Sequence, residues 1–141
     1  MNRINASMVV AGGVVAALIF FVGDAIVNGT LLKAQWSEAL QVVGMSSADE
    51  AFHHPTYFAV HDLLKGLIAV WLYAAIRPRF GSGPRTAIIA GIAVWALVLP
   101  VPMIGLLPMR FLSPQFAATW SILALVPIIA GTVAGAWVYR E

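Results

Sequence analysis

Apolar residues fill four long stretches of this chain, and short polar connections separate them. The stretches cover about residues 6–28, 55–76, 86–107 and 116–139. Each is close to the roughly 20 residues that an α-helix needs to cross the hydrocarbon core of a bilayer. Because hydrocarbon offers peptide groups no hydrogen-bond partner, the pattern predicts an all-α membrane domain over residues 1–141, with four spanning helices.

The composition agrees with this prediction. Hydrophobic residues make up 61% of the 141 residues, charged residues only 10%, and the mean hydropathy is +0.90. Charged residues are roughly a quarter of an ordinary soluble domain. The chain has no cysteine, which excludes disulfides, thiolate catalysis and cysteine-ligated metals. The net charge of +2 rests on few residues, so we expect no nucleic-acid partner.

The positive charges predict how the helices are oriented. One side of the predicted bundle carries Arg3, Arg77, Arg79, Arg85 and Arg140, and the other carries Lys33 and Arg110. By the positive-inside rule, both termini and the 77–85 connection are expected in the cytoplasm, which makes the bundle antiparallel, up-down-up-down. The first stretch is longer than a signal-peptide core and lacks a clear cleavage site, so we expect it to be retained. Arg77, Arg79 and Arg85 are candidate contacts for lipid head groups, although we favour the interpretation that they only set the topology.

The connection between the first two stretches is long and amphipathic. Its apolar residues on one helical face are Leu32, Trp36, Ala39, Leu40 and Val43. This pattern predicts a short interfacial helix on the outer membrane surface, anchored by Trp36, and a helix that docks a partner protein has the same pattern. Further aromatic residues fit belts at the membrane–water interface; these are Tyr57, Trp120, Trp137 and Tyr139.

Five polar residues interrupt the outer halves of the first two stretches. They are Asp24, Asn28, His61, Asp62 and Lys65. A charge at the centre of a membrane helix costs roughly 2.5–3.5 kcal/mol on insertion scales, so we expect these side chains to converge on an outward-facing pocket. The cluster is a structural ion-pair network of Asp24, Lys65 and Asp62, a ligand or ion site, or a catalytic site. His61 changes its charge near neutral pH and is a candidate proton carrier.

Histidines near the start of the second stretch are candidate ligands for a metal or a pigment. His54 and His61 are seven residues apart and share a helical face, and His53 lies beside them. With Asp62 they are a candidate metal site, and one histidine alone is a candidate axial ligand for haem or a chlorin. No metal-binding spacing, catalytic triad, phosphate loop or dinucleotide fingerprint occurs in the sequence, so neither a cofactor nor a catalytic residue is assigned.

Small residues and prolines indicate how the helices pack. Gly131 and Gly135 form a small-xxx-small pair that permits close helix approach, within the chain or between two copies. Pro100 and Pro102 are expected to bend the third helix and to open a gap near the polar cluster.

Two segments carry a resemblance to known proteins. One is GDAIVNGTLL at 23–32, leading to Trp36, and the other is WLYAAIRPRFGSGPRT at 71–86, leading to Trp95. Together they resemble a group of short bacterial four-helix membrane proteins and, more distantly, the DUF1761-type membrane proteins. The resemblance implies a bacterial inner-membrane protein and carries no established activity. Members of the group lack a clear counterpart of the cluster formed by His61, Asp62 and Lys65.

Three functions fit these patterns. Small size and the lack of recognisable chemistry favour a non-catalytic accessory or scaffold subunit of a larger complex, of respiratory or photosynthetic type. Its partners are membrane lipids and other subunits or a second copy. An alternative is a binder or transporter of a small polar solute or cation in the pocket of Asp24, His61, Asp62 and Lys65. The third is a lipid-directed enzyme with His61 as general acid–base. Since neighbouring helical residues diverge by about 100°, we expect Asp24 rather than Asp62 to orient His61.

Overall fold

A computed structural model describes residues 4–110 and 112–139, with the side chains of residues 50 and 51 outside that description. Arg3 and Arg140, two of the residues that predict the orientation, lie outside the described residues. The regular structure within these ranges is entirely helical. Four helical segments are long and apolar enough to cross a membrane, which confirms that part of the prediction. They are Ala6–Leu31, Pro55–Phe80, Pro84–Met109 and Pro114–Val138.

The first segment is an α-helix that widens at its end. Helix α1 (Ala6–Ile26) begins at Asn5, whose side chain accepts a hydrogen bond from the Met8 N–H at 3.3 Å. It continues into a π-helical turn, η1 (Val27–Leu31). In this last part, the Asn28 amide donates to the Asp24 carbonyl at 3.0 Å, and the Thr30 hydroxyl donates to the Ile26 carbonyl. Side chains therefore satisfy backbone carbonyls where the regular helix gives way to the wider turn.

The long connection contains two short helices, α2 (Lys33–Gln41) and α3 (Ala48–Ala51). The amphipathic helix expected here is therefore present as α2. Leu32 and Ala39 are buried and pack in one cluster with Leu112 and Phe116, next to the start of α7 (Pro114–Val138). Val43, at the end of the predicted face, is 60% exposed. The apolar face that begins at Leu32 thus packs onto the helical bundle as far as Ala39.

Prolines mark where the remaining helices begin. Helix α4 (Pro55–Phe80), helix α5 (Pro84–Val98) and α7 each start with proline, whose missing N–H is not needed at that position. Pro55 therefore opens α4 without kinking it. The α4–α5 connection turns at Gly81 and Gly83, whose φ angles of 84° and 131° favour glycine.

The third segment is interrupted, as its prolines predict. Helix α5 ends at Val98, and α6 (Pro100–Leu106) and the short 3₁₀ turn η2 (Leu107–Met109) complete the segment. Leu99 has φ −123° and ψ −76°, outside the α-helical region. The ring of Pro100 disfavours helical geometry at the residue before it, which explains the interruption.

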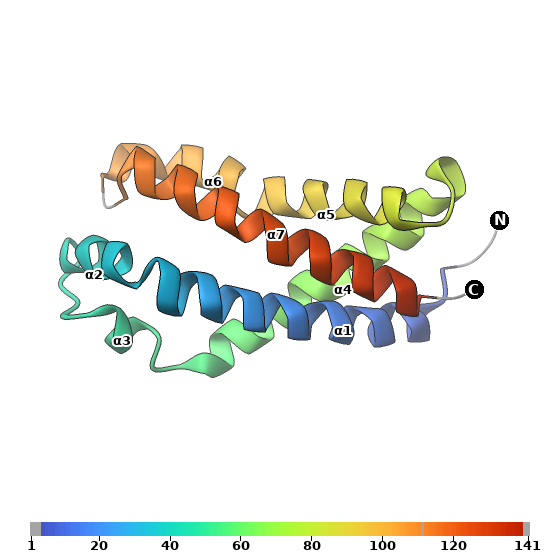
Figure 1. Ribbon diagram of the computed structural model, residues 1–141, viewed down its shortest axis with the longest axis horizontal. Coiled ribbons are helices and arrows are strands. Elements are labelled where there is room, and N and C mark those ends of the chain that lie inside the picture. The colour runs from blue at the N-terminus through green and yellow to red at the C-terminus, as the bar shows by residue number, and fades with distance from the viewer. Residues whose placement is uncertain (1–3, 111, 140–141) are drawn as a thin grey trace.

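Helix α1 packs against both α4 and α7, and α5 packs against α7 and α4 (Figure 1). Glycines allow α1 to approach its neighbours very closely. A Cβ atom at Gly135 would lie 2.6 Å from the Gly12 carbonyl oxygen, and one at Gly131 would lie 2.5 Å from the ring of Phe20. A Cβ atom at Gly66 would collide with the Gly13 carbonyl in the same way. Gly131 and Gly135 therefore face α1 of the same chain.

The two ends of the molecule differ in their side chains. Helices α2 and α3 lie at one end, called here the α2 end, and the α4–α5 connection lies at the opposite end with the first turn of α1 (Figure 1). At that opposite end, the Tyr139 hydroxyl accepts a hydrogen bond from the Asn5 N–H at 3.1 Å. The Arg77 guanidinium lies over the Tyr139 ring at 5.7 Å, whereas Arg79 and Arg85 are exposed.

Candidate functional site

A buried ion-pair network joins α1 to α4 near the α2 end. The Lys65 ammonium lies 2.8 Å from Asp24 Oδ2 and 2.8 Å from Asp62 Oδ1. The side chains of Lys65 and Asp62 are only 3% and 2% exposed, and that of Asp24 is 25% exposed. Asp62 and Lys65 reach each other because they are three residues apart on one helix. Asp24 reaches them because the contact of Gly13 with Gly66 brings α1 against α4.

The network contains one more carboxylate than ammonium. The two carboxylates are close enough to interact electrostatically with each other as well as with Lys65. The Lys65 ammonium also lies 5.0 Å from the centre of the Phe20 ring, on the inner side of α1. An aromatic face attracts a cation, so Phe20 adds to the stabilisation of the buried ammonium.

His61 lies at the edge of this network and contacts Asp62. Its Nδ1 atom is 3.2 Å from Asp62 Oδ1, and its side chain is 57% exposed. The expectation that Asp24 would orient His61 is therefore wrong. Adjacent helical residues do diverge, but the imidazole reaches around the helix surface to the next carboxylate. The structure brings His61, Asp62, Lys65 and Asp24 together, with His61 on the outside.

Asn28 connects the network to the helices at the α2 end. Its amide group donates to the Asp24 carbonyl at 3.0 Å, and its side-chain oxygen accepts a hydrogen bond from the Trp36 indole at 3.0 Å. Asn28 belongs to η1, so a residue of this wide turn holds the Trp36 indole. Both bonds hold Asn28 in place and orient Trp36 toward the protein interior.

A pocket of about 620 Å³ opens beside the network, and we call it the aromatic pocket. Residues of α1, η1, α2, α4 and α7 and of the segment before α4 line it. They are Phe21, Asp24, Ala25, Asn28, Gly29, Trp36, Leu40, Phe52, Pro55, Tyr57, Phe58, His61, Asp62 and Trp120. Most of this surface is apolar, and the polar groups gather on the side formed by α1 and α4. The pocket therefore has aromatic walls and one charged edge.

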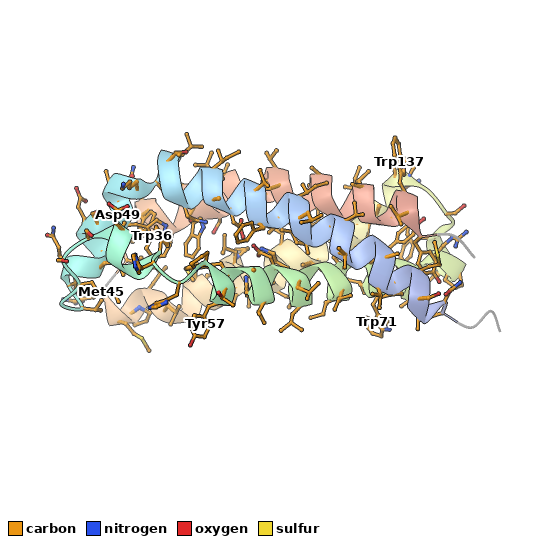
Figure 2. All side chains as sticks on the ribbon, turned by 90° about the horizontal axis from the view of Figure 1, so that it is seen from below. Trp36, Met45, Asp49, Tyr57, Trp71 and Trp137 are labelled. Atoms are coloured by element: carbon orange, nitrogen blue, oxygen red, sulfur yellow. The ribbon has the colours of Figure 1, made fainter. Side chains whose placement is uncertain are left out.

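Aromatic rings in and beside the pocket contact one another. The Trp36 ring makes edge-to-face contacts with Phe52, Phe116 and Trp120, at centroid distances of 6.0, 5.1 and 4.8 Å. Phe52 in turn contacts Phe58 at 5.7 Å. In Figure 2, Trp36 and Tyr57 lie at the α2 end, whereas Trp71 and Trp137 lie at the opposite end. Trp36 and Trp120 are half-buried, so both have a role in the pocket that the prediction of a membrane belt does not include.

The aromatic walls of the pocket are not predicted from the sequence above, although a signal for two of the rings, Phe21 and Phe58, exists. Phe21, Asp24, Ala25 and Asn28 follow the i, i+3, i+4, i+7 spacing of a single helical face. Pro55, Phe58 and Asp62 follow a similar spacing in α4. A helix side that carries both aromatic rings and carboxylates is suited neither to pure lipid nor to a uniform apolar core. The combination of rings and carboxylates therefore indicates one wall of the pocket.

The three histidines lie just before α4 or in its first part. Among the described residues, no group of three or more His, Cys, Asp or Glu side chains is arranged to hold a metal ion. His53 and His54 are exposed, with their rings 6.0 Å apart, and His54 packs against Tyr57 at 6.2 Å. Within the part of the chain that the structure describes, His61 contacts one carboxylate of the network, that of Asp62.

The gap expected near Pro100 and Pro102 is not where the pocket lies. None of the described residues that line the aromatic pocket comes from α5 or α6. Thr119 and Ser121 donate to carbonyls of their own helix, at Gln115 and Ala117, and do not line the pocket. The prolines interrupt the third segment away from the aromatic pocket.

Apolar walls with one charged edge are typical of sites that hold small amphipathic molecules. The charged edge orients such a molecule, and the rings provide most of the buried contact area. Comparison of the chain with protein-family models, curated proteins and solved structures gives no match.

Proposed function

We propose that this is a multi-pass membrane protein whose four long helices form an antiparallel, up-down-up-down bundle in a bacterial inner membrane, with cytoplasmic termini. The outward apolar side chains of the helices support membrane insertion; examples are Leu18, Val22, Ile92, Ile122 and Val126. The close approaches of Gly12 to Gly135 and of Gly23 to Pro127 support the opposite directions of α1 and α7. The bacterial setting rests on the family resemblance, and the orientation rests on the arginines.

Within this bundle, the aromatic pocket binds a small amphipathic organic molecule. The single observation that carries this function is a pocket of about 620 Å³ whose aromatic walls meet a charged edge. Pockets for small molecules usually measure about 300–1,000 Å³ and have mostly apolar walls with few polar groups. The apolar part of the ligand packs against Trp36, Phe58 and Trp120, and its polar part lies near Asp24 and His61.

The ion-pair network supports this binding role and is also structural. Lys65 holds Asp24 and Asp62 in fixed positions, so the charged edge is preorganised before a ligand arrives. The accessory-subunit function and the lipid-directed enzyme stay predictions from the sequence.

Filling the pocket tests the proposed function. Gly29 lines the aromatic pocket, and a Cβ atom there has no neighbour within 4 Å, so Gly29→Leu adds bulk without a backbone collision. Gly105 in α6 has equally open surroundings and does not line the pocket, so Gly105→Leu is a matched control.

The measurement is native mass spectrometry of each protein, extracted gently from the membranes in which it is made. We expect the unmodified protein and Gly105→Leu to carry the same organic adduct and Gly29→Leu to lack it. Equal adducts in both variants, or no adduct on the unmodified protein, would contradict the function.

A further inference from the structure

We propose that the ligand of the aromatic pocket carries an organic ammonium group, and that Asp24 and the surrounding rings bind this group jointly. This inference rests on the proposed function, since it names the chemistry of the molecule that the pocket binds. Three features of the pocket lead to it: the sign of its charge, the accessibility of one carboxylate, and the aromatic walls.

The charge that faces the pocket is negative. The described lining residues include the carboxylates of Asp24 and Asp62 but no lysine or arginine. Lys65 lies behind these carboxylates, with a side chain only 3% exposed. One ammonium therefore balances two carboxylates, and the remaining negative charge faces the ligand. An anionic ligand would be repelled here, and a neutral one would leave a carboxylate partly desolvated without a new partner.

Asp24 is the carboxylate that a ligand can reach. Its side chain is 25% exposed, whereas that of Asp62 is 2% exposed and already contacts both Lys65 and His61. Lys65 binds Asp24 through Oδ2. The hydrogen bond from Asn28 to the Asp24 carbonyl holds this part of α1 and η1 in place. A cation that enters the pocket therefore meets a positioned, accessible carboxylate.

The walls favour an organic cation over a metal ion. Metal ions need several oxygen or nitrogen ligands, and the described residues offer no group of three suitable side chains. Aromatic faces attract ammonium groups, and methylated ammonium groups are recognised in nature by cages of such rings. The pocket supplies rings from separate elements, including Phe21, Trp36, Phe58 and Trp120. An ammonium with apolar substituents satisfies both the rings and the carboxylate.

Two probes of nearly equal shape separate charge from apolar contact. Benzyltrimethylammonium is cationic, and neopentylbenzene has a carbon atom in place of its nitrogen. We would titrate each into the purified protein in lipid nanodiscs, follow tryptophan fluorescence, and subtract the signal of empty nanodiscs. Trp36 and Trp120 line the pocket and report its occupation. The inference predicts that the cation binds about tenfold more tightly than its neutral analogue.

Two variants then assign the effect to the pocket and to Asp24. Asp24→Asn is expected to weaken binding of the cation about tenfold and to leave the neutral probe unchanged. Gly29→Leu should weaken both probes, and Gly105→Leu should weaken neither. The comparison of the two probes on the unmodified protein does not depend on how well Asp24→Asn folds.

The possible failures are distinguishable. Equal affinity for both probes, lost in Gly29→Leu, would overturn the ammonium inference and leave the pocket as a site for neutral molecules. Binding of neither probe would also overturn it, and the adduct measurement decides separately whether the pocket holds a ligand at all. Tighter binding of the neutral probe than of the cation would also overturn the ammonium inference.

Discussion

The Lys65 ammonium lies 2.8 Å from the Asp24 carboxylate, although the two residues are 41 positions apart in the chain. The same ammonium lies 2.8 Å from Asp62, so one buried cation serves two carboxylates on two helices. Removing one member of such a network leaves an uncompensated charge in a region of low dielectric constant, which is far more costly than losing a surface ion pair. The network is therefore both a link between α1 and α4 and a source of fixed charge for the aromatic pocket.

Replacing Lys65 by methionine is expected to destabilise the protein by about 3–5 kcal/mol, because Asp24 and Asp62 lose their shared counter-ion. Thermal unfolding of the purified protein in detergent, followed by circular dichroism, measures the effect. The matched control is Lys33→Met, which breaks the exposed 2.8 Å pair with Asp49. The control should change stability by less than about 1 kcal/mol. Similar losses in the two variants would argue against a special role for the buried network.

Gly135→Val is expected to lower stability by about 1–3 kcal/mol or more, since its side chain would collide with the Gly12 carbonyl and with Val70. The same unfolding experiment applies, with Gly105→Val as control, because a side chain at Gly105 meets nothing within 4 Å. If both valine variants unfold alike, the close contact between α1 and α7 is not what limits substitution at Gly135.

A permanent positive charge at His61 should weaken binding of an organic cation. His61 lines the pocket and is more than half exposed, so its replacement disturbs little packing. We expect His61→Lys to lower the affinity for benzyltrimethylammonium several-fold and His61→Gln to change it little, as titration by tryptophan fluorescence would measure. The affinity for neopentylbenzene should stay constant in both variants. If His61→Gln lowers the affinity for the cation as much as His61→Lys does, the added charge is not the cause of the weaker binding.

The proposed orientation predicts which connections are accessible from outside the cell. The chain has no cysteine, so single cysteine variants report one position each. A membrane-impermeant maleimide should label Met45→Cys, between α2 and α3, in intact cells. The same reagent should label Ser82→Cys, in the α4–α5 connection, only after the membrane is permeabilised. The reverse pattern would invert the orientation, and labelling of both in intact cells would contradict the antiparallel bundle.

The sequence predicts the four long helices well because their signal is local. Length and apolar content act within each segment and do not depend on how the segments pack. The interruption of the third segment at Leu99 is local in the same sense, since Pro100 acts on the residue before it. The orientation of the helices in a membrane stays a prediction.

The shape of the candidate site depends on contacts between distant segments, which a single sequence does not reveal. Depth along the helices indicates that Asp24 and Lys65 are neighbours, but the contact of Gly13 with Gly66 decides that they face each other. The amphipathic pattern of α2 does not distinguish a face that meets lipid from one that packs on the bundle. The pattern predicts that Trp36 anchors the helix at a membrane surface, and it does not reveal that Trp36 also bonds Asn28 and lines the pocket.

The separation of 41 positions in the sequence between Asp24 and Lys65 also has a consequence for biosynthesis. In the proposed membrane setting, the ribosome completes α1 well before it makes α4, so Asp24 reaches the bilayer ahead of its partner. An unpaired carboxylate disfavours full insertion of the first helix until the second one arrives. In that setting the Asp24–Lys65 ion pair, which removes this cost, forms only after the lysine has been translated.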